Sequence, residues 1–240
     1  MIEYLPADSL AHIGAGPFAA EGRTLRLEYF TGLDVGQARD PSALAVVEWA
    51  EQTAEWDPAQ YAYQKTTSLR LRYLQRVELG TPYPELVERA GRVACSRSME
   101  GPLHLVVDAT GVGRPIVDLL RMQRLACRLW PVIITSAHTV GWSSGCYTVP
   151  KRDLIVGLQV LVQRGRLEAA KGMREWPVLV KEMGEMRVET PSGARERFGA
   201  REGAHDDLVL AVALACWAAE RVHPERGGTC GFVQRPLLSF

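Results

Sequence analysis

The 240-residue sequence predicts a mixed α/β fold, in which a central mixed β-sheet of three antiparallel strands followed by parallel strands is flanked by helices on both faces. Three observations predict this class. Three strand-like segments follow one another in the first third of the chain, and helical and strand-like segments then alternate. The chain also contains a strongly apolar stretch at residues 208–219, which is typical of a buried helix.

The first three elements predict an antiparallel meander. Residues 24–36 alternate apolar and polar positions before they become apolar, and residues 42–50 form a second strand-like segment after the turn "ARDP". Residues 68–79 predict a half-buried third strand, and the polar residues before it predict a connection. The apolar positions that alternate along this third segment are Leu69, Leu71 and Tyr73.

The middle of the chain predicts two helix–strand pairs. Residues 82–97 place apolar side chains at helical spacing, and residues 103–108, "LHLVVD", are nearly all apolar, as in a strand covered on both faces. Residues 114–122 predict a second helix, and residues 127–136 predict another strand. The order βββαβαβ therefore indicates a mixed sheet with helices on both faces.

The second half is more helical. Residues 150–165 predict a helix that ends at Gly165, and residues 176–186 predict another. Residues 187–198 predict a hairpin around "PSG", and residues 203–222 predict a final apolar helix that begins at two adjacent aspartates. Between the two halves lies a loop that contains His138, for which we expect flexibility and a place near the site.

This organisation predicts one domain. We expect residues 1–24 to be an N-terminal leader or linker, residues 25–223 to form the domain, and residues 224–240 to be a C-terminal tail. The sequence contains neither an export signal nor an apolar run of the ~20 residues that a membrane span needs. We therefore expect no membrane partner.

Charge and cysteine content exclude several classes. The 28 basic and 28 acidic residues give a formal net charge of zero, so the whole chain is not drawn electrostatically to nucleic acid or membrane, although a local basic strip remains possible. The 5 cysteines are scattered and lack the C-x-x-C spacing. This pattern indicates a reducing cytoplasm rather than a disulfide framework or a zinc site.

Acidic residues stand where three apolar elements meet loops. Asp34 ends the first strand, Asp108 ends the fourth, and Asp206 and Asp207 begin the last helix. In a βββαβ arrangement the first and fourth strands can lie side by side, so these carboxylates can converge. Converging carboxylates repel one another unless cations neutralise them, and Mg²⁺ or Mn²⁺ prefers such oxygen ligands. Two such ions could activate water and stabilise the leaving oxygen of a phosphodiester.

Each acid also has a purely structural interpretation. Asp108 could cap the helix that follows it, and Asp206 or Asp207 could cap the last helix. The convergence of all four carboxylates, rather than any one of them, favours a metal site.

Four segments carry a family resemblance: "GLDVGQARDPSA", "VVDATGVGRPIVDLL", "VPKRDLIVGLQVLVQRGRL" and "REGAHDDLVLAVALACW". In this order and spacing they resemble the nuclease domain of the large terminase subunit of tailed bacteriophages, over about residues 25–222. The resemblance implies an RNase H-like fold related to Holliday-junction resolvases. It also implies cleavage of double-stranded DNA during genome packaging by two bound Mg²⁺ or Mn²⁺ ions.

The resemblance assigns roles to individual residues. Asp34, Asp108 and Asp207 would be catalytic metal ligands, with Asp206 beside them, and Asp40 would be a ligand of the second ion. It further implies a terminase ATPase domain or small subunit and the portal as partners, in the cytoplasm of a bacterial host.

One departure matters. Large terminase subunits carry a packaging ATPase, but the chain contains no G-x-x-x-x-G-K-[ST] phosphate loop. The chain is therefore either a nuclease domain of a longer protein or a stand-alone homologue. Two other functions remain open: an inactive RNase H-like module that binds DNA or a partner, and a nucleotide-binding protein that uses "DATGVG", although its glycine pattern departs from known phosphate-binding fingerprints.

Basic residues near the acids are candidates for DNA binding. We expect phosphate contacts from residues in two places, the 187–198 hairpin region and the start of the 150–165 helix. These residues are Arg195, Arg197, Arg201, Lys151 and Arg152. A solvated strand face balanced by neighbouring glutamates explains the hairpin arginines equally well. His205, beside Asp206, could assist water or the leaving group, or could serve a capping role.

Overall fold

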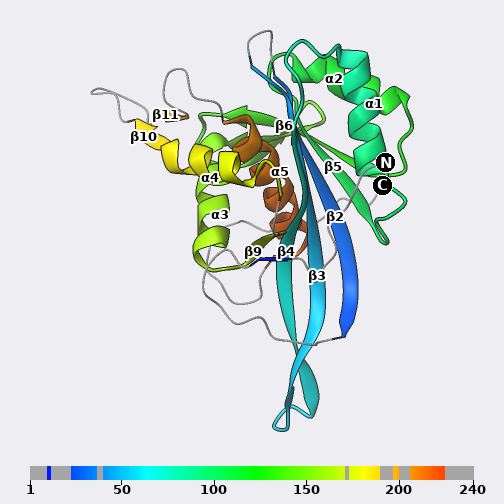
Figure 1. The fold of residues 1–240 in the computed structure, drawn as a ribbon, viewed down its shortest axis with the longest axis vertical. Helices are drawn as coiled ribbons and strands as arrows, with labels where there is room; N and C mark the ends of the chain where they lie inside the picture. Colours follow the sequence, from blue (N-terminus) through cyan, green and yellow to red (C-terminus); the bar gives the residue numbers. More distant parts are fainter. Residues whose placement is uncertain are drawn as a thin grey trace.

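The computed structural model describes residues 10–11, 23–36, 40–170, 173–189, 197–199 and 206–224. It contains one large mixed sheet with helices on both faces, as the sequence predicts (Figure 1). Within the described residues the large sheet has nine strands in the order β1-β9-β4-β3-β2-β5-β6-β8-β7, and β10 pairs with β11 separately. The helices fall short of the length and apolar character that a membrane span needs across the same described ranges.

Each strand and helix that the sequence predicts is present, with shifted ends, and the sheet has further strands. The strands are β1 Leu10–Ala11, β2 Thr24–Asp34, β3 Ala43–Asp57, β4 Ala62–Arg76, β5 Leu103–Asp108, β6 Arg128–Thr135, β7 Gly141–Ser143, β8 Cys146–Pro150, β9 Leu167–Ala170, β10 Arg187–Glu189 and β11 Arg197–Gly199. The helices are α1 Tyr83–Ala94, α2 Gly113–Met122, α3 Lys151–Gln163, α4 Trp176–Glu185 and α5 Asp207–Val222.

The predicted meander and the predicted neighbour of its first strand are both present. Strands β2, β3 and β4 pair antiparallel in chain order, because short connections return the chain to the adjacent position. Strand β5 then pairs parallel with β2, and β6 pairs parallel with β5. The carboxyl ends of β2 and β5 therefore lie at the same edge of the sheet.

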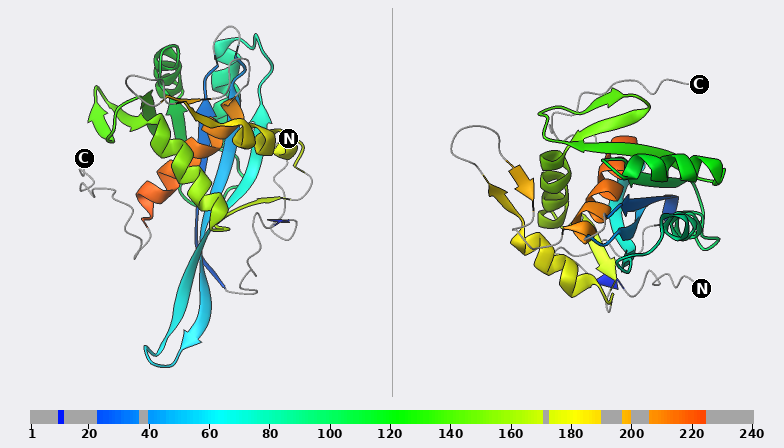
Figure 2. Two further views of the ribbon diagram at one scale, coloured as in Figure 1. Left: turned by 90° about the vertical axis from the view of Figure 1, so that its left-hand side faces the viewer. Right: turned by 90° about the horizontal axis from the view of Figure 1, so that it is seen from above.

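Two apolar layers enclose the sheet. Helices α1 and α2 pack on one face, where Leu33, Leu105 and Val107 contact them, and α3, α4 and α5 pack on the other. Figure 2 shows α5 between the sheet and α3, which explains why 13 of its residues are buried. The predicted buried helix is therefore confirmed.

Helix α5 approaches β2 closely because Gly32 has no side chain. A Cβ atom at Gly32 would lie 1.9 Å from the carbonyl oxygen of Ala211, which is backbone and cannot swing away. The small residue thus sets the distance between the helix and the strand that carries Asp34.

Several expectations are wrong. The polar segment before residue 68 is not a simple connection, because β3 and β4 extend through it as a long two-stranded arm that projects from the sheet (Figure 1). The loop around His138 is followed by the short hairpin β7–β8 rather than by irregular chain. Strands β1 and β9 have no counterpart in the predicted elements.

Tyr73 also differs from its predicted position. Leu69 and Leu71 face α5, but a bulge at Arg72 adds a residue to β4, and Tyr73 packs on the opposite face with α1 and α2. A one-residue insertion reverses which face every later side chain occupies. Leu74 and Arg76 consequently turn toward the α5 face.

Candidate active site

Asp34 and Asp108 end two adjacent parallel strands. Leu33 pairs with Val107, so the next residue on each strand is an aspartate at the same level of the sheet. Leu33 and Val107 face α1 and α2, and because side chains alternate along a strand, both aspartates face α5. Each is buried, with 8% and 9% of its surface exposed.

Helix α5 brings two further carboxylates to this point. Asp206 directly precedes the helix and Asp207 is its first residue. Burial raises the pKa of Asp34 well above its usual value, and the charges of Asp108, Asp206 and Asp207 raise it further. The charges of the three other predicted acids, on β5 and at the start of α5, therefore all act on Asp34.

The pKa of Asp108 is also raised. Burial is the largest cause, although hydrogen bonds from Thr110, the charge of Lys151 and a hydrogen bond with Asp34 act in the opposite direction. The backbone N–H of Thr110 donates to Asp108 Oδ1 at 2.8 Å.

Lys151 supplies one positive charge. It begins α3 and donates to Asp206 Oδ2 at 2.6 Å, and its charge lowers the pKa of both Asp34 and Asp108. The sequence predicted Lys151 as a DNA ligand from its place at a helix start. In the structure its ammonium group contacts an acid of the cluster.

Arg76 supplies a second positive charge, which the sequence interpretation missed. Its Nε and Nη2 groups donate to the two carboxylate oxygens of Asp207 at 2.7 and 3.1 Å. Ala43 pairs with Asp34 on one side and with Arg76 on the other, so the three residues form one row across the sheet on the α5 face. The small alanine leaves this row open to α5.

A fifth acid, Glu182, was also missed. It lies on α4, is 5% exposed, and contacts the guanidinium group of Arg76. Burial and the charge of Asp207 raise its pKa to about 7, against the lowering effects of Arg76 and the backbone of Val209. A glutamate near the middle of a helix gives no sequence signal of such a contact, because it depends on how α4 packs against α5.

The side chains of Asp206 and Asp108 do not cap the helices that follow them. Within the described residues, Asp206 is the N-cap of α5 but makes no side-chain cap hydrogen bond, and its carboxylate turns to Lys151. Asp108 bonds to Thr110 rather than to the first turn of α2, whose N-cap is Val112. Capping therefore does not account for these acids.

The donor set fits a hard divalent cation in its chemistry. Buried carboxylate oxygens with raised pKa values gain most from such an ion, because it favours their charged form. Among the described residues, however, no group of three or more His, Cys, Asp and Glu side chains stands in an arrangement that would hold a metal. Asp206 and Asp207 are turned toward Lys151 and Arg76 instead.

The remaining predicted residues that the structure describes lie in three places. Asp40 is exposed at a bend before Pro41, and Arg152 is exposed on the first turn of α3. Arg197 begins β11, opposite Glu189. Arg195, Arg201 and His205 lie outside the described residues, as does the predicted turn of their hairpin.

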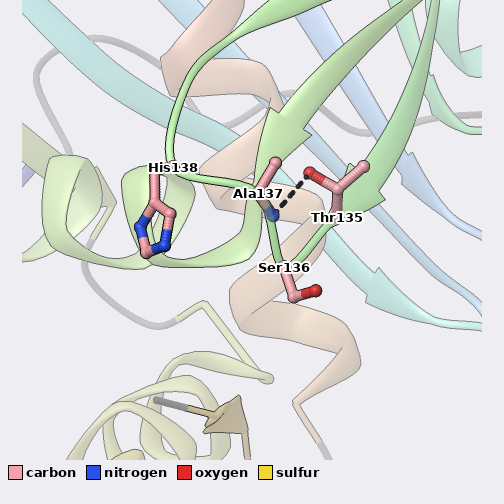
Figure 3. Close-up of a pocket in the computed structure, with 4 residues that line it drawn as sticks. All are labelled: Thr135, Ser136, Ala137 and His138. Carbon is pink, nitrogen blue, oxygen red and sulfur yellow. Dashed lines mark hydrogen bonds between the residues drawn. The ribbon is translucent and has the colours of Figure 1, made fainter. Parts of the chain in front are cut away.

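A pocket lies at the same end of the sheet. Thr135, Ser136, Ala137 and His138 line it, in the loop that follows β6 (Figure 3). Thr135 pairs with Pro150, the residue before Lys151, and accepts a hydrogen bond from the backbone N–H of Ala137 at 3.3 Å. The register of β6 and β8 thus places the start of this loop beside the start of α3.

The fold has counterparts among solved structures. The chain matches the large terminase nuclease from the thermophilic phage G20c, with bound magnesium, at a TM-score of 0.55 and 20% sequence identity over 90% of this chain and 91% of that chain. The same nuclease with bound cobalt matches equally well. The large terminase nuclease domain of Thermus phage P74-26 matches at a TM-score of 0.51 and 20% identity, over 80% of this chain and 81% of that one.

These matches establish the fold as that of terminase nuclease domains, which is RNase H-like. No protein-family model and no curated protein sequence matches the chain.

Proposed function

We propose that the chain is a metal-dependent endonuclease that hydrolyses DNA phosphodiester bonds. The observation that carries this proposal is the pair of buried carboxylates on adjacent parallel strands, Asp34 and Asp108, faced by the two aspartates that begin α5. A folded chain retains such a mutually repelling group only if it serves a purpose that outweighs its cost. The similarity of fold to metal-bound terminase nucleases supports the same conclusion.

In this proposal Asp34, Asp108 and Asp207 are the catalytic metal ligands, with Asp206 beside them and Asp40 as a candidate for a second position. Two Mg²⁺ or Mn²⁺ ions would supply an activated water and stabilise the leaving oxygen of the phosphodiester. The protein contributes the rigid strand ends that fix Asp34 and Asp108. Lys151 and Arg76 hold the helix acids close to that pair.

The substrate in this proposal is double-stranded DNA. Arg152, Arg195, Arg197 and Arg201 would contact phosphates without reading sequence, and Lys151 would contribute positive charge nearby. The biological setting would be genome packaging in a bacterial host cytoplasm, with a terminase ATPase domain or small subunit and the portal as partners.

One observation favours a second function. Lys151 and Arg76 already neutralise part of the acid cluster. An RNase H-like module that binds DNA or a partner without cutting could keep its acids in this internally paired state.

A plasmid-nicking assay separates the two functions. The purified protein is incubated with supercoiled plasmid in Mn²⁺, Mg²⁺ or EDTA, beside Asp108→Asn and the control Asp118→Asn. Asp118 is an exposed residue of α2 that pairs with Arg121, so the substitution Asp118→Asn should leave activity unchanged. The endonuclease proposal requires metal-dependent nicking by the parent and the control, and none by Asp108→Asn. DNA binding without nicking by all three proteins favours the binding module.

A further inference from the structure

Arg76 binds the same carboxylate oxygens that a divalent cation at Asp207 would bind. Its guanidinium group covers both carboxylate oxygens of Asp207, at 2.7 and 3.1 Å. A cation bound by Asp207 needs lone pairs of the same oxygens. The two modes of binding therefore compete, and Arg76 must release at least one oxygen for an ion to coordinate there.

A second acceptor for Arg76 lies within reach. Glu182 contacts Nη2 of the same guanidinium group and is 5% exposed, so Arg76 already joins two buried carboxylates from α4 and α5. The Arg76 side chain itself is 30% exposed. Rotation away from Asp207 would leave it fully paired with Glu182 rather than unpaired in a buried site.

The position of Arg76 depends on the bulge in β4. Without the extra residue at Arg72, the side chain at position 76 would point toward α1 and α2. Bulges often redirect a side chain beside an active site. The sheet irregularity and the bidentate contact are thus two separate features that place one arginine on one acid of the cluster.

We propose that Arg76 is a positioning residue that competes with the divalent cation for Asp207, and that it transfers to Glu182 when the cation binds. This inference rests on the proposed function, because it concerns the same metal site. It makes the Arg76–Glu182 pair the element that sets how tightly the site holds its cation.

Calorimetric titration with MnCl₂ in the absence of DNA tests the competition. Arg76→Gln should bind Mn²⁺ more tightly than the parent, by a factor on the order of five, because a competing charge is removed. Glu182→Gln should bind Mn²⁺ more weakly by a similar factor, because Arg76 then has only Asp207 to pair with. Arg121→Gln, which loses a surface pair with Asp118, is the matched control and should bind as the parent does.

The double variant decides how Glu182 acts. In the Arg76→Gln background, Glu182→Gln should have little further effect if Glu182 works only through Arg76. An equal loss of affinity in both backgrounds would mean that Glu182 acts independently, which would overturn the transfer. Unchanged or weaker Mn²⁺ binding by Arg76→Gln would overturn the competition itself.

Folding and the underlying function are controlled separately. Circular dichroism melting checks each variant, and Arg76→Lys, which keeps the charge without the bidentate fork, should bind Mn²⁺ with intermediate affinity. Weaker binding by Arg76→Lys than by the parent would also contradict the proposal. If the parent binds Mn²⁺ and nicks DNA, the results for the variants test only the competition at Asp207. If the parent binds no Mn²⁺, the proposed function is contradicted as well.

Discussion

Strand β2 carries two buried acids on the same face, and their surroundings are opposite. Glu28 and Asp34 are 1% and 8% exposed and lie six residues apart, so both point toward α5. Burial raises the pKa of Glu28, but His223, Arg26 and His104 more than offset it, and the net pKa is lowered. The pKa of Asp34 is raised by burial and by three other aspartates.

The carboxylate of Glu28 finds all its partners within the protein. Trp130 Nε1 donates to His104 Nδ1 at 3.1 Å, which leaves the proton of His104 on Nε2, 3.2 Å from the Glu28 carboxylate. His223, at the end of α5, lies 3.0 Å from the same carboxylate and stacks on Trp49. This cluster pins the carboxyl end of the helix to the sheet.

The acids around Asp34 are not fully neutralised by partners from the protein. Helix α5 rises about 24 Å over its 16 residues and runs back along β2, so its first residue lies at Asp34 and its last turn at Glu28. At one end of the helix the buried acid, Glu28, is matched by partners from the protein itself, namely His223, Arg26 and His104. At the other end four aspartates share two cations, Lys151 and Arg76, and an external cation would complete this arrangement.

The largest effect is expected at Gly32, because the position of α5 beside both Glu28 and Asp34 depends on this residue. Gly32→Ala places a methyl group against the α5 backbone, so the helix must move away from β2 and disturb both acids. We expect a loss on the order of 3 kcal/mol in the free energy of unfolding, measured by urea denaturation.

Gly157→Ala is the matched control for this substitution. Gly157 lies in α3 and has nothing within 4 Å of an added Cβ atom. It should be neutral or gain up to about 1 kcal/mol. Equal behaviour of the two alanine variants would contradict the close packing of α5 on β2.

Neutralising the two acids of β2 should have opposite effects on stability. Glu28→Gln removes the charge that His223, His104 and Arg26 surround, so we expect a loss of about 1–3 kcal/mol in EDTA at pH 7. Asp34→Asn removes a repelling charge and should gain about 1 kcal/mol under the same conditions. If urea denaturation shows an equal loss of stability for both variants, the surroundings of Glu28 and Asp34 do not differ as described.

The pH dependence of this difference has a definite sign. A carboxyl group whose pKa is higher in the folded than in the unfolded protein adds stability below the unfolded pKa, 3.8 for Asp34, and loses it as the pH rises through the folded pKa. The advantage of Asp34→Asn over the parent in EDTA should therefore grow from pH 4 to pH 8. Melting temperatures at both pH values would show this, and a constant advantage would contradict it.

The smallest effect concerns DNA affinity. Alanine at both Arg195 and Arg197 should weaken binding of a short duplex and flatten the slope of log affinity against log salt by about 1–2, because up to two phosphate contacts are lost. Fluorescence anisotropy at several salt concentrations measures this slope. An unchanged slope would remove these arginines from the proposed interface without affecting the comparison of the two acids.

The sequence predicts the acids but not their partners, and the reason is physical. An aspartate at the end of an apolar strand is visible as an anomaly, and the βββαβ order allows the first and fourth strands to lie side by side, which would bring Asp34 close to Asp108. Arg76 reaches Asp207 only because of a bulge that no composition rule locates, and Glu182 reaches Arg76 only through the packing of α4. The same bulge made the predicted face of Tyr73 wrong.

The most direct test of the central claim is diffraction from crystals soaked in MnCl₂, measured at the manganese absorption edge. The claim that the Asp34 end is held for a divalent cation predicts an anomalous peak within about 2.5 Å of oxygens from both Asp34 and Asp108, absent from Asp108→Asn crystals. Carboxylates without a manganese peak, with Lys151 and Arg76 still bound to Asp206 and Asp207, would contradict it.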